Sequence, residues 1–163
     1  MKSADYDSMD EVEIIEFDPK YAQRFADLNY HWIAETYGIE QHDHDILDHP
    51  QEAVVDPGGQ IFFAITGDEV AGTVAMIPFG DDSYELTKMA VDSKFRGRGI
   101  GDKLMAACIE FTRQKERKSI ILESNTKQAA AVQLYRKFGF RETPLDPNSQ
   151  YVRANIRMEL VVN

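Results

Sequence analysis

The segment that most constrains the fold joins a predicted strand to a long predicted helix and reads Arg96-Gly97-Arg98-Gly99-Ile100-Gly101. Its three alternating glycines allow the backbone to turn several N–H groups toward one point. The helix that follows adds unpaired N–H donors and the positive end of its dipole. Arg96 and Arg98 contribute positive charge. We therefore predict that this loop binds a bulky anion, for which a pyrophosphate is the natural candidate.

The spacing of the glycines distinguishes this loop from two other phosphate-binding loops. A nucleoside triphosphatase loop requires Gly-Lys followed by Ser or Thr, whereas Gly101 is followed by Asp102-Lys103-Leu104. A dinucleotide-binding fingerprint requires Gly-x-Gly-x-x-Gly after a first strand, and this loop has neither the spacing nor the early position. The pattern that remains is Arg-x-x-Gly-x-Gly. A glycine-rich turn that binds no ligand is the alternative.

Hydrophobic periodicity predicts a mixed α/β sheet with helices on both faces, antiparallel early and partly parallel late. Strands are expected over residues 11–17, 61–65, 70–77, 84–91, 119–123 and 154–161, with a further strand starting near Phe140. Helices are expected from Asp18, as N-cap, to Gly38, over 99–117 and over 128–138. Residues 41–59 are polar and contain two prolines, so we expect a short helix followed by a loop.

Two features of residue chemistry limit the kinds of site to expect. We interpret the cluster of His42, Asp43, His44, Asp45 and His49 as solvated surface rather than a metal site, because two histidines two residues apart lack the usual further ligands. Cys108 is the single cysteine and shares a helical stripe with apolar residues. It is therefore expected in the core, with no disulfide and no nucleophilic role.

Length and charge predict one cytoplasmic domain. The 163 residues suit a flexible segment over residues 1–10 and a single domain over 11–163. No run of about 18 apolar residues is present and the first residues are acidic and polar, so neither a membrane span nor a secretory signal is expected. The net charge of −10 disfavours nucleic acid as a partner. Monomer and homodimer both stay open.

Two blocks of this sequence resemble the GNAT family of N-acetyltransferases. Glu85 to Gly101 matches, without a gap, the family's strand followed by Arg-x-x-Gly-x-Gly. A second block follows, with Leu122-Glu123-Ser124-Asn125 and then an ending of the form Leu-Tyr-x-x-x-Gly-Phe at residues 134–140. The resemblance covers residues 11–161, tightly over 84–140. It implies the GNAT fold, with a mostly antiparallel sheet of about six or seven strands, and transfer of an acetyl group from acetyl-CoA to an amine.

The resemblance also implies which residues hold the cofactor. The backbone of Met89, Ala90 and Val91 would pair with the pantetheine arm of coenzyme A, on a strand that diverges from its neighbour. The loop over residues 96–101 would hold the pyrophosphate. Asn125 would meet the pantetheine from the next strand, although capping the following helix is an alternative role for it.

The same resemblance implies catalytic roles. Tyr135 would protonate the departing thiolate, with simple packing as the alternative. Glu85 would act as general base or bind the cationic acceptor, with an exposed strand position as the alternative. A backbone N–H at Met89 or Ala90 would stabilise the developing oxyanion. Attack is expected to be direct, in a ternary complex.

The acceptor amine is the part that the sequence defines least. The resemblance suggests a pocket formed by Trp32, Tyr37, His42, His44, Glu85, Tyr151, Arg153 and Asn155. An enclosed pocket would favour a small amine, and a broad groove would favour a protein. A non-catalytic acyl-CoA sensor or scaffold and an acyltransferase that uses a longer acyl group are the alternative functions.

Overall fold

The computed structural model describes residues 11–162, so the predicted flexible segment over residues 1–10 lies outside the described residues. The described chain forms a single seven-stranded sheet with the order β1-β2-β3-β4-β5-β7-β6. The strands are β1 (Glu13–Glu16), β2 (Gln60–Thr66), β3 (Glu69–Phe79), β4 (Ser83–Val91), β5 (Ser119–Ser124), β6 (Arg141–Thr143) and β7 (Ile156–Val161). Of the neighbouring pairs, β4–β5 is parallel and the others are antiparallel. The predicted mixed, mostly antiparallel sheet is confirmed.

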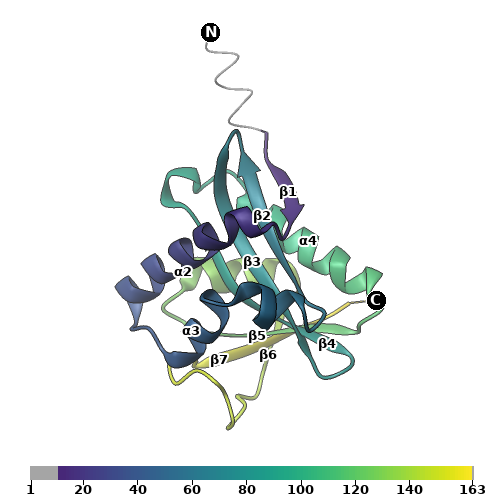
Figure 1. Cartoon of the computed structure of the whole chain (residues 1–163). Coiled ribbons are helices and arrows are strands. Elements are labelled where there is room, and N and C mark those ends of the chain that lie inside the picture. Colours follow the sequence, from purple (N-terminus) through teal and green to yellow (C-terminus); the bar gives the residue numbers. More distant parts are fainter. Residues whose placement is uncertain (1–10, 163) are drawn as a thin grey trace.

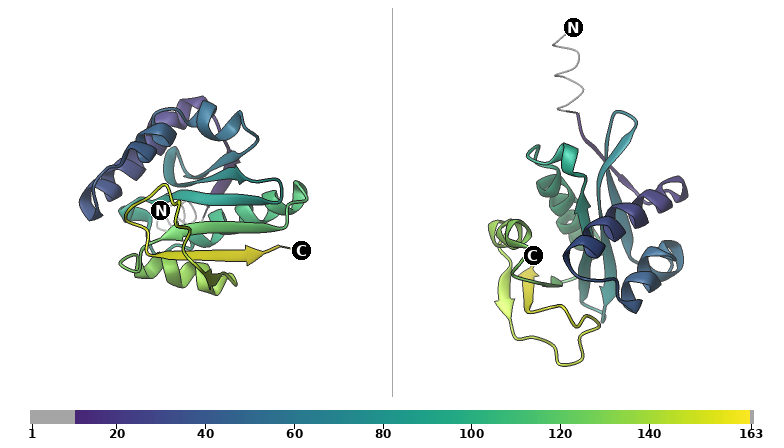
Figure 2. Two further views of the ribbon diagram at one scale, coloured as in Figure 1. Left: turned by 90° about the horizontal axis from the view of Figure 1, so that it is seen from below. Right: turned by 90° about the vertical axis from the view of Figure 1, so that its left-hand side faces the viewer.

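Helices cover both faces of the sheet (Figures 1 and 2). One face carries α2 (Ala22–Thr36) and α3 (Gln41–Leu47), and the other carries α4 (Ile100–Gln114) and α5 (Ala129–Lys137). Asp18 caps the short helical turn Pro19–Tyr21 that leads into α2, as predicted, by accepting the Lys20 N–H. No helix among residues 11–162 combines the length and the apolar character that crossing a bilayer requires.

Each face of the sheet has its own apolar core, because successive strand residues point to opposite sides. In β2, Phe63 packs in the core beneath α2 and α3, whereas its neighbour Phe62 packs in the core beneath α4. Cys108 lies in the second core and is fully buried, as expected for a packing residue. Burial raises the pKa of its thiol well above the usual range, so it stays protonated.

The segment over residues 41–59 differs from the sequence prediction in two respects. After α3 the chain forms a π-helical turn, Gln51–Val55, in which Val54 is fully buried, where a loop was predicted. Asp43 is also fully buried rather than solvated. The reason is helical spacing: Asp43, Ile46 and Leu47 share the face of α3 that packs inward. Among the residues described here, no group of three or more His, Cys, Asp or Glu side chains could hold a metal ion.

Strands β4 and β5 separate partway along their length, as the resemblance implies. They pair only from Ser83↔Ser119 to Glu85↔Ile121. Beyond that point β4 continues to pair with β3, while β5 pairs with β7 up to Ser124. Within residues 11–162, the edge of β4 that faces β5 therefore has no strand partner over residues 86–91.

Candidate functional site

A cavity of about 1050 Å³ occupies the space between the diverging strands. Its walls come from α2, from β4 over residues 86–91, from residues 123–125 at the end of β5, and from α5. Residues between 92 and 102 border one end, where α4 begins, and residues between 151 and 154 border the other. The cavity therefore connects the glycine-rich loop to the segment that precedes β7.

The glycine-rich loop has the open backbone expected of an anion site. Gly97 and Gly99 have positive φ angles of 79° and 74°, which other residues adopt only with strain. A Cβ atom added at either glycine would meet nothing within 4 Å, so the space beside the loop is open. Gly101 has a different role, because a Cβ there would stand 3.2 Å from Leu134 Cδ2 of α5. The predicted residues Ile100 and Arg96 also line the cavity.

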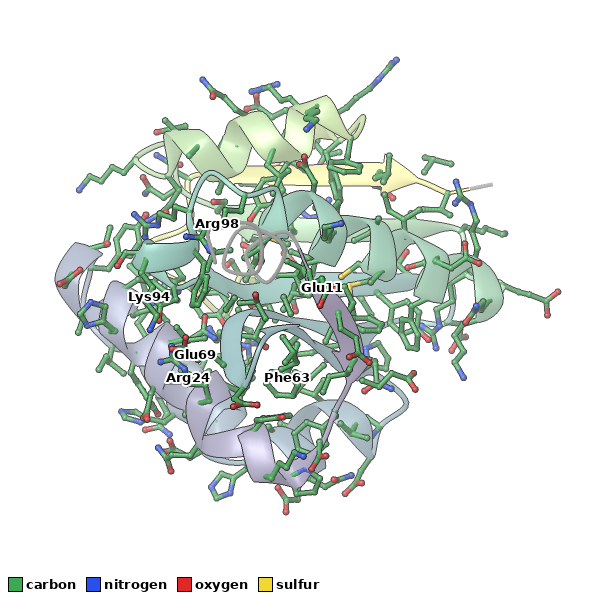
Figure 3. The ribbon with its side chains drawn as sticks, turned by 90° about the horizontal axis from the view of Figure 1, so that it is seen from above. Glu11, Arg24, Phe63, Glu69, Lys94 and Arg98 are labelled. Carbon is green, nitrogen blue, oxygen red and sulfur yellow. The ribbon has the colours of Figure 1, made fainter. Side chains whose placement is uncertain are left out.

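A polar network fixes the start of this loop to two other elements. Asp92 accepts the Lys94 N–H and a hydrogen bond of 2.5 Å from the Arg24 guanidinium of α2. Lys94 in turn forms an ion pair with Glu69, at the start of β3 (Figure 3). Arg98 does not line the cavity, since its guanidinium lies over the Phe95 ring at 5.3 Å.

A bulge in β4 directs Lys88 toward Asp43 and Tyr151, at the edge of the cavity. The β3–β4 register shifts between Thr73 and Ala75, and Lys88 has a φ of 56°. Its ammonium donates to Asp43 Oδ1 at 2.6 Å and to the Tyr151 hydroxyl at 2.7 Å. Burial lowers the pKa of Lys88, and the hydrogen bond and charge of Asp43 oppose that shift.

Asp43 binds a second cation. The Arg153 guanidinium donates to its two oxygens at 2.7 and 2.8 Å. Burial alone would raise the pKa of Asp43, but hydrogen bonds from Arg153 and Lys88 outweigh it and hold that pKa well below its usual range. A fully buried carboxylate thus stays ionised between two cations.

Two carboxyl groups lie beside this cluster. Burial raises the pKa of Glu85 to about 7, and the nearby charge of Glu123 adds to the shift, while Lys88 and Arg157 oppose it. Glu85 itself does not line the cavity, whereas Glu123 does and accepts a hydrogen bond from the Ser149 hydroxyl. Glu123 is therefore the carboxylate that a ligand would meet first.

Tyr135 and Asn125 line the cavity and also serve the local structure. Tyr135 is 7% exposed and packs against Phe140, with ring centroids 5.8 Å apart. Burial raises its pKa to about 12, so the hydroxyl keeps its proton. Asn125 accepts the Lys127 N–H ahead of α5 and donates to the Arg153 carbonyl at 2.8 Å.

The structure gathers some of the predicted acceptor residues and not others. Trp32, Tyr37, Tyr151 and Arg153 line the cavity. His42 lies behind Tyr151, with ring centroids 4.9 Å apart, and burial lowers its pKa. Asn155 and His44 face other partners, Thr126 and Tyr30 respectively.

Sequence reasoning missed Lys88, Asp43 and Glu123 as site residues. The bulge at Lys88 does leave a signal, because the large apolar side chains of β4 fall at residues 84 and 86 and then at 89 and 91. That one-residue slip in alternation indicates a bulge. Nothing in the local sequence indicates that Asp43 would meet residues from β4 and from the end of the chain.

Comparison with known proteins agrees with this architecture. Residues 26–140 match the family model described as the acetyltransferase (GNAT) family. N-acetyltransferase 8B from Rattus norvegicus is 33% identical over 104 residues, which are 61% of this chain and 47% of that protein. N-acetylaspartate synthetase from the same organism is 31% identical over 117 residues, 71% of this chain and 38% of that protein. The chain thus spans less than half the length of these curated relatives.

Solved structures share the fold. A GNAT-family acetyltransferase from Staphylococcus aureus Mu50 superposes with a TM-score of 0.85 at 22% identity, covering 94% of this chain and 100% of that one. The protein yncA from Salmonella typhimurium, solved with its cofactor acetyl-CoA, gives a TM-score of 0.75 at 18% identity, covering 93% of this chain and 94% of that one. The family model, the diverging strands and the glycine-rich loop lead to one conclusion: the chain belongs to the GNAT acetyltransferase family.

Proposed function

We propose that this chain transfers the acetyl group of acetyl-CoA to a primary amine by direct attack in a ternary complex. The observation that carries the proposal is the cavity between β4 and β5, which leads from the glycine-rich loop to the carboxyl group of Glu123. The relatives named N-acetyltransferase and N-acetylaspartate synthetase support an amine acceptor. The Salmonella neighbour, solved with acetyl-CoA, supports the acetyl donor.

The loop and β4 have the features that coenzyme A requires. Open space at Gly97 and Gly99 leaves room for a diphosphate close to the backbone, and the first N–H groups of α4 lack helical partners. Arg96 is exposed beside them and supplies charge. The partnerless edge of β4 at Met89, Ala90 and Val91 offers backbone groups to the pantetheine amides, with Asn125 on the opposite wall.

Attack requires a neutral amine, so a group on the acceptor side must take a proton from the ammonium form. We assign this role to Glu85, whose pKa of about 7 makes it half-ionised near neutral pH. Because Glu85 does not itself line the cavity, the proton reaches it through Glu123, whose charge acts on Glu85, or through water. Glu123 also attracts the cationic acceptor.

The remaining steps stabilise charge on the donor. A backbone N–H at Met89 or Ala90, just after the bulge, would donate to the oxyanion that forms when nitrogen bonds to the thioester carbon. As the carbon–sulfur bond breaks, Tyr135 faces the thiolate. With a pKa of about 12 the phenol holds its proton more tightly than a thiol does, so we assign it a hydrogen bond to the leaving sulfur.

A thiol-release assay tests the proposal directly. Purified protein is supplied with acetyl-CoA and a panel of amines, amino acids and lysine peptides, and calorimetry measures acetyl-CoA affinity in parallel. We expect micromolar binding and acceptor-dependent thiol release. Binding without release, for every acceptor, would reject the transferase and leave an acyl-CoA sensor. No binding at all would reject the family's cofactor for this chain.

A further inference from the structure

The connection between β6 and β7, residues 144–155, borders the acceptor end of the cavity, and we call it the strap. Its residues Tyr151, Arg153 and Ala154 line the cavity wall. In Figure 1 the strap, at the bottom of the view, passes beside α3. An acceptor that approaches from this end therefore meets the strap, which α3 holds in place.

The strap is bonded to the elements around it. Arg153 binds both oxygens of Asp43 in α3 at 2.7 and 2.8 Å, and the Val152 N–H donates to Glu40 at 3.2 Å. Tyr151 accepts from Lys88 of β4 at 2.7 Å. The strap thus joins α3 to the sheet across the end of the cavity.

These contacts are costly to break, because the charged groups that form them are largely buried. The side chain of Asp43 is 0% exposed, that of Lys88 is 2% exposed and that of Arg153 is 15% exposed. Pulling the strap from α3 would leave buried charges without partners, which is far more costly than parting an exposed ion pair. The two-point geometry between Arg153 and Asp43 also fixes the angle at which the segments meet.

The space that the cavity offers beside the strap limits the size of the acceptor. Pockets for a single drug-sized ligand measure about 300–1,000 Å³. Here the cavity of about 1050 Å³ extends from the glycine-rich loop to the strap, so both reactants must share it. An extended peptide advances about 3.3 Å per residue, so a peptide that enters from this end would have to pass the strap, which Arg153 holds against α3.

We propose that the acceptor is a small free amine of about amino-acid size, and that the Arg153–Asp43 contact excludes extended peptides. This inference depends on the proposed transferase function. It makes Arg153 and Asp43 specificity-determining residues, which act by holding the strap, one wall of the site, against α3.

A length series with the unchanged protein tests the size limit without relying on any variant. The acceptors are one amino acid, then a dipeptide, a tripeptide and a hexapeptide with the same first residue. We expect kcat/KM to fall at least 100-fold from the free amino acid to the hexapeptide, whichever first residue the amine panel selects. Equal or higher kcat/KM for the longer peptides would overturn the inference while leaving the transferase function intact.

Variants at Arg153 test the contact itself. Arg153→Gln should raise the ratio of the hexapeptide kcat/KM to the amino-acid kcat/KM at least tenfold. Arg153→Lys keeps the charge but loses the two-point geometry, so its ratio should lie between those of the unchanged protein and Arg153→Gln. The control is Arg136→Gln, which removes an exposed ion pair between Arg136 of α5 and Glu142 of β6. It should leave the ratio unchanged. An unchanged ratio in a folded Arg153→Gln protein would show that the Arg153–Asp43 contact does not exclude peptides. If that variant does not fold, Arg153→Lys and the length series decide.

Discussion

At the scale of single residues, the environment of Glu85 changes what a common side chain can do. A glutamate in water is ionised at neutral pH and is a poor proton acceptor, whereas burial and the charge of Glu123 bring Glu85 to a pKa of about 7. A general base works best when its pKa lies near the working pH. The position of Glu85 in the fold raises its pKa, and that raised pKa suits it to the proposed role of proton acceptor.

The pH dependence of turnover follows from that pKa. Because the protonated carboxyl cannot accept a proton, kcat/KM should fall about tenfold per unit as the pH drops below about 7. Glu85→Gln should abolish this limb and lower kcat/KM at about pH 8 by roughly 100-fold. A profile measured from about pH 5 to about pH 9, with acetyl-CoA saturating, checks both effects.

Stability provides an independent check on the same group. The folded-state pKa of about 7 exceeds the ordinary value of 4.5, so the unfolded chain ionises first as the pH rises. The contribution of protonated Glu85 to stability is present below about 4.5 and is lost by about 7. Relative to the Glu85→Gln variant, the wild-type melting temperature should therefore decline across this window. An exposed control, Glu142→Gln, should show no such trend.

At the scale of elements, the glycine-rich loop combines strain with open space. Gly99 precedes α4 with a φ of 74°, and nothing stands within 4 Å of where its Cβ would be. The turn between β3 and β4 offers a matched position at Gly80, with a φ of 59° and the same open surroundings. The two glycines thus differ mainly in whether they border the cavity.

This pair allows backbone strain to be separated from ligand binding. Gly99→Glu should reduce acetyl-CoA affinity at least about 100-fold, because the side chain adds bulk and negative charge where the diphosphate is proposed to lie. Gly80→Glu should cost a similar amount of stability, about 1 kcal/mol, and leave affinity unchanged. Calorimetry and thermal denaturation measure the two quantities. Equal loss of affinity in both variants would contradict the proposed location of the diphosphate.

The elements themselves were largely predictable, since their signals are local. Apolar spacing located the strands and the long helices, and the glycine pattern located the loop that borders one end of the cavity. The bulge at Lys88 was also within reach, through the slip in alternation between Leu86 and Met89. The burial of Asp43 was not, because it depends on partners 45 and 110 residues away in the chain. Charged residues that pair across a long stretch of sequence produce no periodic pattern in that sequence.

At the scale of the whole molecule, Asp43 joins segments that are far apart in sequence. Its carboxylate binds Lys88 of β4 and Arg153 of the strap from its own place in α3. Asp43 is the shared partner of both cations. Its loss would therefore affect α3, β4 and the strap at once.

Removing this charge should be costly. Asp43→Asn leaves two buried cations facing a neutral amide, and we expect a loss of about 3–5 kcal/mol in the free energy of unfolding. Chemical denaturation measures it, with Asp82→Asn as control because that residue pairs with Lys118 on the surface, where the exposed side-chain fractions are 66% and 78%. The control should lose less than about 1 kcal/mol. A similarly small loss in Asp43→Asn would show that its contacts contribute little to folding.

The link between α3 and the strap also bears on how such a domain diversifies. A chimaera that took α3 from another family member, while keeping its own strap, would place Arg153 against a surface selected for a different neighbour. A chimaera that took the strap from another family member, while keeping its own α3, would likewise leave Asp43 without Arg153 as a partner. Divergence toward new acceptors must therefore alter both segments together, and directed evolution of this domain would need paired libraries covering both sides of the contact.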